Sequence, residues 1–137
     1  MTATAIIPTM RYRNARRMID WLGAAFHFRP HMIVDGEGGR IEHAQLVLGK
    51  AMSMLGDHRD DDFGALQRPA DMGAAVNQSP YVVIADVDAV YASAKAAGAD
   101  IVVEIHDPEY GGRMFSCRDP EGQLWNFGSY DPWADPA

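Results

Sequence analysis

The spacing of apolar residues changes along the chain between a helical period and the alternation that is typical of strands. Residues 15–27 carry apolar side chains at helical spacing, which predicts an amphipathic helix that begins after the capping residue Asn14. Residues 86–97 repeat this spacing in an alanine-rich stretch. Short apolar and β-branched runs at residues 3–10 and 80–85 predict a strand before each helix. The pattern therefore predicts two similar halves.

Each predicted helix is followed by three further predicted strands. In the first half these strands cover residues 31–34, 41–48 and 51–55. In the second half they cover residues 101–105, 113–118 and 123–130. The order strand, helix and three strands thus occurs twice, as modules 3–56 and 80–130 of a single domain that spans residues 1–137.

The hairpin near the end of the chain has the strongest turn signal. Asp119 to Gly122 place Pro at the second and Gly at the fourth position of a turn, between an alternating strand and an aromatic-rich one. Between the two modules, residues 57–79 show no sustained period and contain an acidic cluster. A loop of this length is usually functional or disordered, so a lid over a pocket and a simple connector both remain open for this segment.

Composition places the chain among soluble globular proteins. It has 137 residues, 47% of them hydrophobic and 23% charged, which suits one domain with a real core. The formal net charge of −7 argues against a nucleic-acid partner, and the apolar runs are too short for a membrane span. The single cysteine, Cys117, lies on an apolar strand face and is expected to be a buried small hydrophobe. A cytoplasmic location is expected.

The string from Phe115 to Gly122, followed by Leu124 and Trp125, resembles the closing hairpin of the vicinal oxygen chelate superfamily. This group comprises glyoxalases, bleomycin resistance proteins and extradiol dioxygenases, and the string is most similar to the small PhnB-type glyoxalase-like branch. The resemblance implies an α+β fold in which two tandem βαβββ modules form a curved, partly closed mixed sheet. It also implies a homodimer with shared cavities. The element order derived from periodicity agrees with this fold.

Catalytic members of the superfamily hold a divalent metal with four side chains, two from each module. By resemblance, these positions fall at Ile7, Ser53, Ser79 and Asn126. None of the four offers the imidazole, carboxylate or thiolate that such ions usually take. A shift of one residue brings in no such ligand either, since the neighbouring residues are Ile6, Pro8, Met52, Met54, Gln78, Pro80, Trp125 and Phe127. No metal at these positions and no other cofactor is therefore expected, and a divalent metal bound elsewhere remains open.

The family pattern also suggests which side chains line a pocket. If Asn126 faces the cavity, alternation and the usual family arrangement add the following candidates for ligand binding: Met52, Ser53, Met114, Ser116 and Arg118. A mainly apolar pocket with a few polar groups is the general profile of a small-molecule site, although the same residues also suit a filled core. His43, beside Glu42 on a strand, is the candidate catalytic base or ligand, with a structural hydrogen bond as the alternative.

Two functions follow from these observations and the resemblance. The first is a small-molecule-binding protein like the bleomycin resistance proteins, which sequesters a drug or metabolite without the usual metal. The alternative is a glyoxalase-like lyase or isomerase that acts on a small metabolite with His43, Glu42 or a metal bound elsewhere. A dimeric scaffold that keeps the fold without a ligand also remains open.

Overall fold

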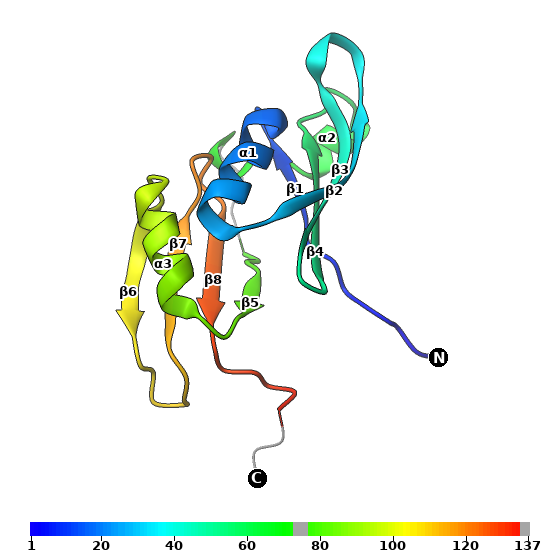
Figure 1. The fold of residues 1–137 in the computed structure, drawn as a ribbon. Coiled ribbons are helices and arrows are strands. Elements are labelled where there is room, and N and C mark those ends of the chain that lie inside the picture. The colour runs from blue at the N-terminus through cyan, green and yellow to red at the C-terminus, as the bar shows by residue number, and fades with distance from the viewer. Residues whose placement is uncertain (73–76, 135–137) are drawn as a thin grey trace.

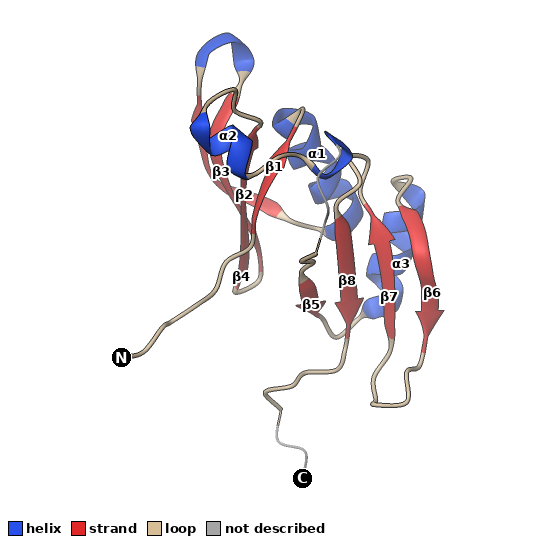
Figure 2. Cartoon of the chain, turned by 180° about the vertical axis from the view of Figure 1, so that it is seen from behind, coloured by secondary structure: helices blue, strands red, loops and turns tan. Residues whose placement is uncertain are grey.

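The computed structural model describes residues 1–72 and 77–134, and its first module has the predicted order βαβββ. Its elements are β1 (Thr9–Tyr12), α1 (Ala15–Phe26), β2 (Arg29–Asp35), β3 (Ile41–Leu48) and β4 (Ala51–Asp57), with a short 3-10 turn, η1 (Glu37–Gly39), between β2 and β3. The second module repeats the order with β5 (Tyr81–Val83), α3 (Val87–Ala96), β6 (Asp100–His106), β7 (Met114–Arg118) and β8 (Leu124–Gly128). Figures 1 and 2 show the two modules side by side.

The strands form two four-stranded mixed sheets that are not closed. Their orders are β1-β4-β3-β2 and β5-β8-β7-β6. In each sheet the first strand of the module runs parallel to the last, and the other neighbours are antiparallel. The α+β class and the two tandem βαβββ modules predicted from the sequence are therefore confirmed, with two open sheets in place of one curved sheet.

Helix α1 begins and ends where its capping residues predict. The side chain of Asn14 accepts a hydrogen bond from the N–H of Arg17 (3.1 Å), and His27 ends the helix in the left-handed conformation (φ 70°). The apolar face of the helix is buried, and its buried residues are Ala15, Met18, Ile19, Leu22, Ala25 and Phe26.

The two modules share one hydrophobic core that centres on α1. The Phe26 ring lies 5.2 Å from that of Trp125 and 4.6 Å from that of Phe127, both on β8 of the second module. In Figure 1, α1 lies between the two sheets, and α3 covers one face of the second sheet. Because the core crosses the module boundary, we expect the modules to fold as one unit.

The turn from Asp119 to Gly122 also joins the modules. The carboxylate of Asp119 accepts hydrogen bonds from the hydroxyl of Tyr12 (2.6 Å) and the indole N–H of Trp125 (3.1 Å). The carboxylate of Glu121 accepts from the backbone N–H of Asn14 (3.0 Å), just before α1. Both acidic side chains are buried, so the second module's hairpin is tied to the start of the first helix.

The segment between the modules contains more regular structure than its sequence pattern predicts. Residues Asp62–Leu66 form a short helix, α2, and Ala70–Met72 form a 3-10 turn, η2. Asp61 caps α2 by accepting from the N–H of Gly64 (3.0 Å), and this bond lowers the pKa of Asp61. Gly64 is required there, because a Cβ atom would lie 1.5 Å from the carbonyl oxygen of Arg59. Residues 73–76 lie outside the described part of the segment.

Several element boundaries differ from the sequence prediction. The first strand covers Thr9–Tyr12 and not residues 3–10, because pairing with β4 includes only those four residues. Strand β5 is likewise short, at Tyr81–Val83, because its pairing with β8 covers three residues. Apolar composition alone does not define where a partner strand is available. No helix of the described residues has the length and apolarity needed to cross a membrane.

Cys117 lies in the core between the second sheet and the helices, as its sequence context predicts. Its side chain is fully buried, and burial raises the pKa of the thiol to about 12. We therefore expect no alkylation of Cys117 by iodoacetamide at neutral pH in the native protein, and complete alkylation in denaturant. Mass spectrometry of the two reactions checks this, and labelling of the native protein faster than its global unfolding would contradict it.

Candidate functional site

The second sheet has one face packed on the helices and one open face. On β7 and β8, alternation places Phe115, Cys117, Trp125 and Phe127 in the core. The opposite face carries Met114, Ser116 and Arg118 from β7, and Leu124 and Asn126 from β8. Register pairs Ser116 with Asn126 and Arg118 with Leu124. Four of the predicted binding residues therefore do share one face: Met114, Ser116, Arg118 and Asn126.

Asn126 is held by a local hydrogen-bond network. Its side-chain oxygen accepts from the hydroxyl of Ser116 (2.7 Å). Its side-chain N–H₂ donates to the hydroxyl of Ser79 (2.8 Å) and to the carbonyl of Pro80 (3.0 Å). Both N–H groups of the amide are in use, so Asn126 anchors the segment that leads into β5.

The open face of the first sheet carries a second group of half-buried side chains. His43 and Gln45 lie on β3, and Met52 and Met54 lie on β4, with Gln45 paired to Met54. Ser53 lies on the other face, where it is buried and its hydroxyl contacts the sulfur of Met10 (3.7 Å). The structure thus places Met52 on the open face and Ser53 in the core.

Strand register identifies the residue of the first module that corresponds to Asn126. Tyr81 of β5 pairs with Asn126, and Thr9 of β1 pairs with Met54. Met54 therefore occupies the equivalent position, and Ser53 is one residue away. The difference arises because the β3–β4 hairpin turns over two residues, whereas the β7–β8 turn is longer.

The opening strands correspond in the same way. Pro8 and Pro80 accept equivalent backbone hydrogen bonds from β4 and β8 (2.9 and 3.0 Å). Ile7 and Ser79, which precede these prolines, therefore also correspond to each other, as the family resemblance implied.

The four equivalent positions do not fit a divalent metal of the kind the resemblance implies. Ile7 has no donor atom, and Met54 has only a thioether, which suits soft ions. Ser79 and Asn126 carry neutral oxygens and hydrogen-bond to each other. Among residues 1–72 and 77–134, no group of three or more His, Cys, Asp or Glu side chains is placed to hold a metal ion.

A cavity of about 630 Å³ lies at the seam between the modules. One wall is the start of the chain up to β1, a second is the segment before β5, and a third is the stretch around α2 and η2. Its lining residues are Ile6, Ile7, Pro8, Thr9, Met10, Leu66, Gln67, Arg68, Ala70, Asn77, Gln78, Ser79, Pro80 and Gln123. Its size is that of a typical small-molecule site.

The cavity lining combines apolar surface with hydrogen-bonding groups. Gln67 donates to the backbone carbonyl of Thr9 (3.0 Å), which fixes the segment after α2 against β1. Arg68 is exposed and makes no ion pair with the described residues. Ser79 connects the cavity to the network of Asn126 on the open face. The arrangement can take a ligand with both apolar and polar groups.

The sequence-predicted residues and the cavity are largely separate. The predicted candidates His43, Met52, Ser53, Met114, Ser116, Arg118 and Asn126 are all absent from the lining. Sequence reasoning did not find Gln67, Arg68 and Gln123. The one available signal was the long segment at residues 57–79, which in the structure supplies two of the three walls.

The polar environments of His43 and Arg118 are simple. A ring nitrogen of His43 lies 3.1 Å from the side-chain nitrogen of Gln45, and no carboxylate of the described residues pairs with the ring. Arg118 is exposed, and it forms no ion pair with Asp119, whose carboxylate is directed toward Tyr12 and Trp125.

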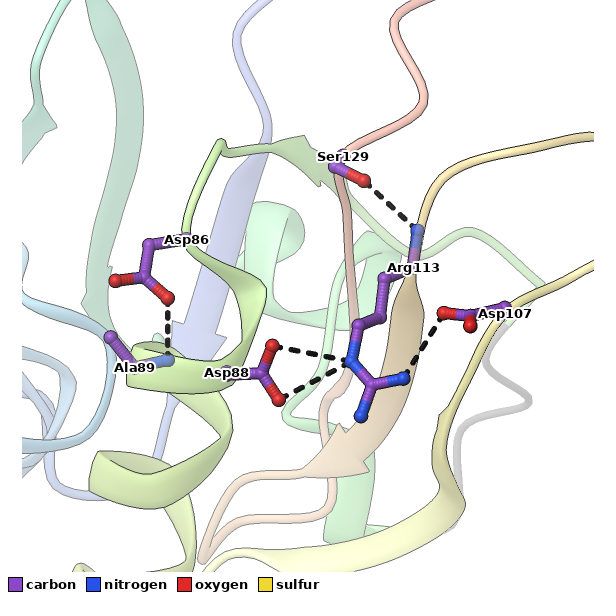
Figure 3. Close-up of polar contacts among 6 residues, drawn as sticks. All are labelled: Asp86, Asp88, Ala89, Asp107, Arg113 and Ser129. Atoms are coloured by element: carbon purple, nitrogen blue, oxygen red, sulfur yellow. Dashed lines mark hydrogen bonds and ion pairs between the residues drawn. The ribbon is translucent and has the colours of Figure 1, made fainter.

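Arg113 has a structural role at the start of β7. Its guanidinium bonds to the carboxylates of Asp88 (3.2 Å) and Asp107 (3.0 Å), and its backbone N–H donates to the hydroxyl of Ser129 (2.9 Å) (Figure 3). The hydrogen bonds to Asp107 and Asp88, in that order, raise the pKa of Arg113, and the bond to Asp88 ties the start of β7 to the first turn of α3.

Comparison with known proteins agrees with this fold. The model of the Glyoxalase/Bleomycin resistance protein/Dioxygenase superfamily matches residues 6–127, which is most of the chain. The chain belongs to this superfamily. Among solved structures, this superfamily member is similar to TioX from Micromonospora sp. ML1, with 29% identity, a TM-score of 0.73, and coverage of 92% of this chain and 98% of TioX.

Two further relatives extend the comparison. The protein Mb0911c of Mycobacterium bovis is 27% identical over 90% of this chain and 82% of its own length. The fosfomycin resistance protein FosX from Listeria monocytogenes has the same fold, with 13% identity, a TM-score of 0.70, and coverage of 96% of this chain and 94% of FosX. The structure of FosX is that of a complex with Mn(II) and a dihydroxypropylphosphonic acid.

Proposed function

We propose that this superfamily member binds a small molecule without a divalent metal, and sequesters a drug or metabolite. The observation that carries the proposal is the seam cavity of about 630 Å³ next to Ser79 and Asn126. At these two positions, where the family's metal ligands stand, the side chains are neutral and bonded to each other. The cavity supplies shape and hydrogen-bonding groups, which are sufficient for binding.

One protein of the same fold holds a metal ion. FosX was crystallised with Mn(II), so the fold accommodates metal-bound members. The donor set of this chain differs, because Ile7, Met54, Ser79 and Asn126 include no imidazole or carboxylate. The string from Phe115 to Gly122 is our reason to place the protein in the PhnB-type branch. We also propose a homodimer, since the open faces of both sheets expose apolar side chains, such as Met32, that a second copy can cover.

Metal content and fragment binding test the proposal together. We expect purified protein to hold less than about 0.1 equivalent of Zn, Ni, Fe or Mn, because a protein with a dedicated divalent metal site binds close to one equivalent. In EDTA-treated, ¹⁵N-labelled protein, a panel of small fragments should perturb the amide resonances of Gln67, Ser79 and Gln123. Shifts at these residues that appear only after Mn²⁺ or Zn²⁺ is added would contradict metal-independent binding.

The enzyme alternative depends on His43, whose imidazole is half-exposed on the open face of the first sheet. If purified protein carries about one equivalent of metal, and His43→Ala removes it while His31→Ala does not, the lyase or isomerase interpretation replaces the binding proposal. His31 is a suitable control because it lies on β2 and is exposed.

A further inference from the structure

Three tyrosines from separate segments gather at the end of the second sheet. Tyr81 lies on β5, Tyr110 in the loop between β6 and β7, and Tyr130 just after β8. Together with Pro132 they line a shallow, open depression of about 410 Å³. The seam cavity shares none of these four lining residues, so this is a separate site.

Contacts within the cluster hold the rings in place. The hydroxyl of Tyr81 donates to the backbone carbonyl of Tyr130 (2.7 Å). The rings of Tyr110 and Tyr130 meet edge to face, with centroids 5.3 Å apart. The Tyr81 side chain crosses Gly128 so closely that a Cβ atom there would lie 2.4 Å from its hydroxyl oxygen. Aromatic faces held in this way form a preorganised surface.

The one charged side chain shown to act on Tyr81 among the described residues is the carboxylate of Asp131. Burial, the two neighbouring tyrosines and Asp131 raise the pKa of Tyr81, in that order. The guanidinium of Arg113 is bonded to the carboxylates of Asp88 and Asp107 (Figure 3). The aromatic faces and the carboxylate of Asp131 both favour a cation over an anion.

The protein's own cations stack on other aromatic rings. Arg11 and Arg59 lie over Phe63, and Lys95 lies over Tyr91. Within the described residues, no Lys or Arg side chain lies over Tyr81, Tyr110 or Tyr130. The three rings are partly exposed, at 38% for Tyr81, 58% for Tyr110 and 42% for Tyr130, so an external cation can reach them.

We propose that the shallow depression lined by Tyr81, Tyr110, Tyr130 and Pro132 binds an organic cation of the quaternary-ammonium class. Such a cation is weakly hydrated, and it gains electrostatic attraction from each aromatic face it contacts. The site does not depend on the proposed function of the seam cavity, and either one can fail without the other.

Choline and its neutral isostere, 3,3-dimethyl-1-butanol, are the probes that separate charge from shape. In ¹H–¹⁵N NMR titrations of the full chain, we expect choline to shift the amides of Tyr81, Tyr110 and Tyr130 with a Kd about tenfold lower than that of the isostere. Equal affinity for the two probes, or no saturable shift with choline up to about 50 mM, overturns the proposal.

Matched variants identify the rings as the cause. Tyr110→Leu removes one exposed ring and should raise the Kd for choline by about threefold or more, whereas Tyr110→Phe keeps the ring and the affinity. Phe63→Leu removes an exposed ring elsewhere and should have no effect. Unchanged affinity in Tyr110→Leu overturns the proposal. Dissociation of an oligomer by Tyr110→Leu in size-exclusion chromatography also overturns it, because the rings then belong to a subunit interface.

Discussion

Asp119→Ala is expected to lower the free energy of unfolding by about 3–5 kcal/mol, since breaking a buried, hydrogen-bonded charge leaves its partners unsatisfied. The carboxylate accepts four hydrogen bonds, from the Tyr12 hydroxyl, the Trp125 indole and the backbone N–H groups of Glu121 and Gln123. Tyr12 and Trp125 are almost fully buried, so water cannot replace the lost acceptor.

Urea denaturation followed by tryptophan fluorescence measures this loss. Asp20→Ala is the matched control, because Asp20 is exposed on α1, and its stability should stay within about 0.5 kcal/mol of the wild type. A loss of less than about 1 kcal/mol in Asp119→Ala would show that the turn is not a main connection between the modules.

Asp119 also makes the stability depend on pH. Burial raises the pKa of Asp119 above its usual range, although the hydrogen bonds from Tyr12 and Trp125 oppose this shift. A raised folded-state pKa means that the folded chain holds the proton more tightly than the unfolded chain. The part of the stability that is linked to this proton is therefore present below its unfolded pKa of about 3.9 and is lost as pH rises through the folded pKa, while the hydrogen bonds to the carboxylate remain.

The pH dependence is best read as a difference between wild type and Asp119→Asn, whose amide does not titrate. We expect the stability of the wild type relative to this variant to fall as pH rises above about 4. Urea midpoints at a series of pH values give the slope, and a relative stability that increases with pH would contradict the raised pKa.

Phe26→Ala is expected to cost about 3–5 kcal/mol of stability, the range for truncating a fully buried aromatic residue. Phe26 is completely buried and contacts three rings, those of Trp21 (5.1 Å), Trp125 (5.2 Å) and Phe127 (4.6 Å). Trp125 and Phe127 belong to the second module, so the cavity left by the substitution lies between the two modules. We therefore expect the variant to unfold in one cooperative transition, with a lower free energy of unfolding for the whole chain.

Phe63→Ala makes the same chemical change at an exposed position, where Phe63 is 41% accessible. Its cost should be below about 1 kcal/mol. Two separate unfolding transitions in Phe26→Ala, one of wild-type stability, would show that the modules fold independently and would contradict the shared core.

The joined modules explain how the chain supports a seam cavity. Asp119 and Glu121 fix the β7–β8 turn against the residues before α1, and Phe26 fixes α1 against β8. The residues that lead into β1 and β5 are thereby brought together, with Ile7 and Ser79 in the same cavity lining. The turn that carries the family resemblance is thus also a structural link between the two halves of the proposed binding site.

The order of the elements could be predicted from the sequence because it depends on local patterns. Helical spacing in residues 15–27 and 86–97, and alternation in the strands, reflect which faces are buried. The capping role of Asn14 and the turn at Asp119 likewise depend on neighbouring residues only. The sequence alone also indicates that no imidazole or carboxylate stands at the family's metal positions. Strand register corrects one of these positions from Ser53 to Met54, which has no such group either.

Only the tertiary structure decided which distant residues meet. The hydrogen bond from Tyr12 to Asp119 joins positions that are 107 residues apart, and no local sequence pattern predicts it. The seam cavity and the cluster of Tyr81, Tyr110 and Tyr130 depend in the same way on how the two modules and their loops pack. Periodicity records whether a side chain is buried, but it does not record its partner. Partners are set by register, turn length and packing across the core, and these are properties of the folded chain.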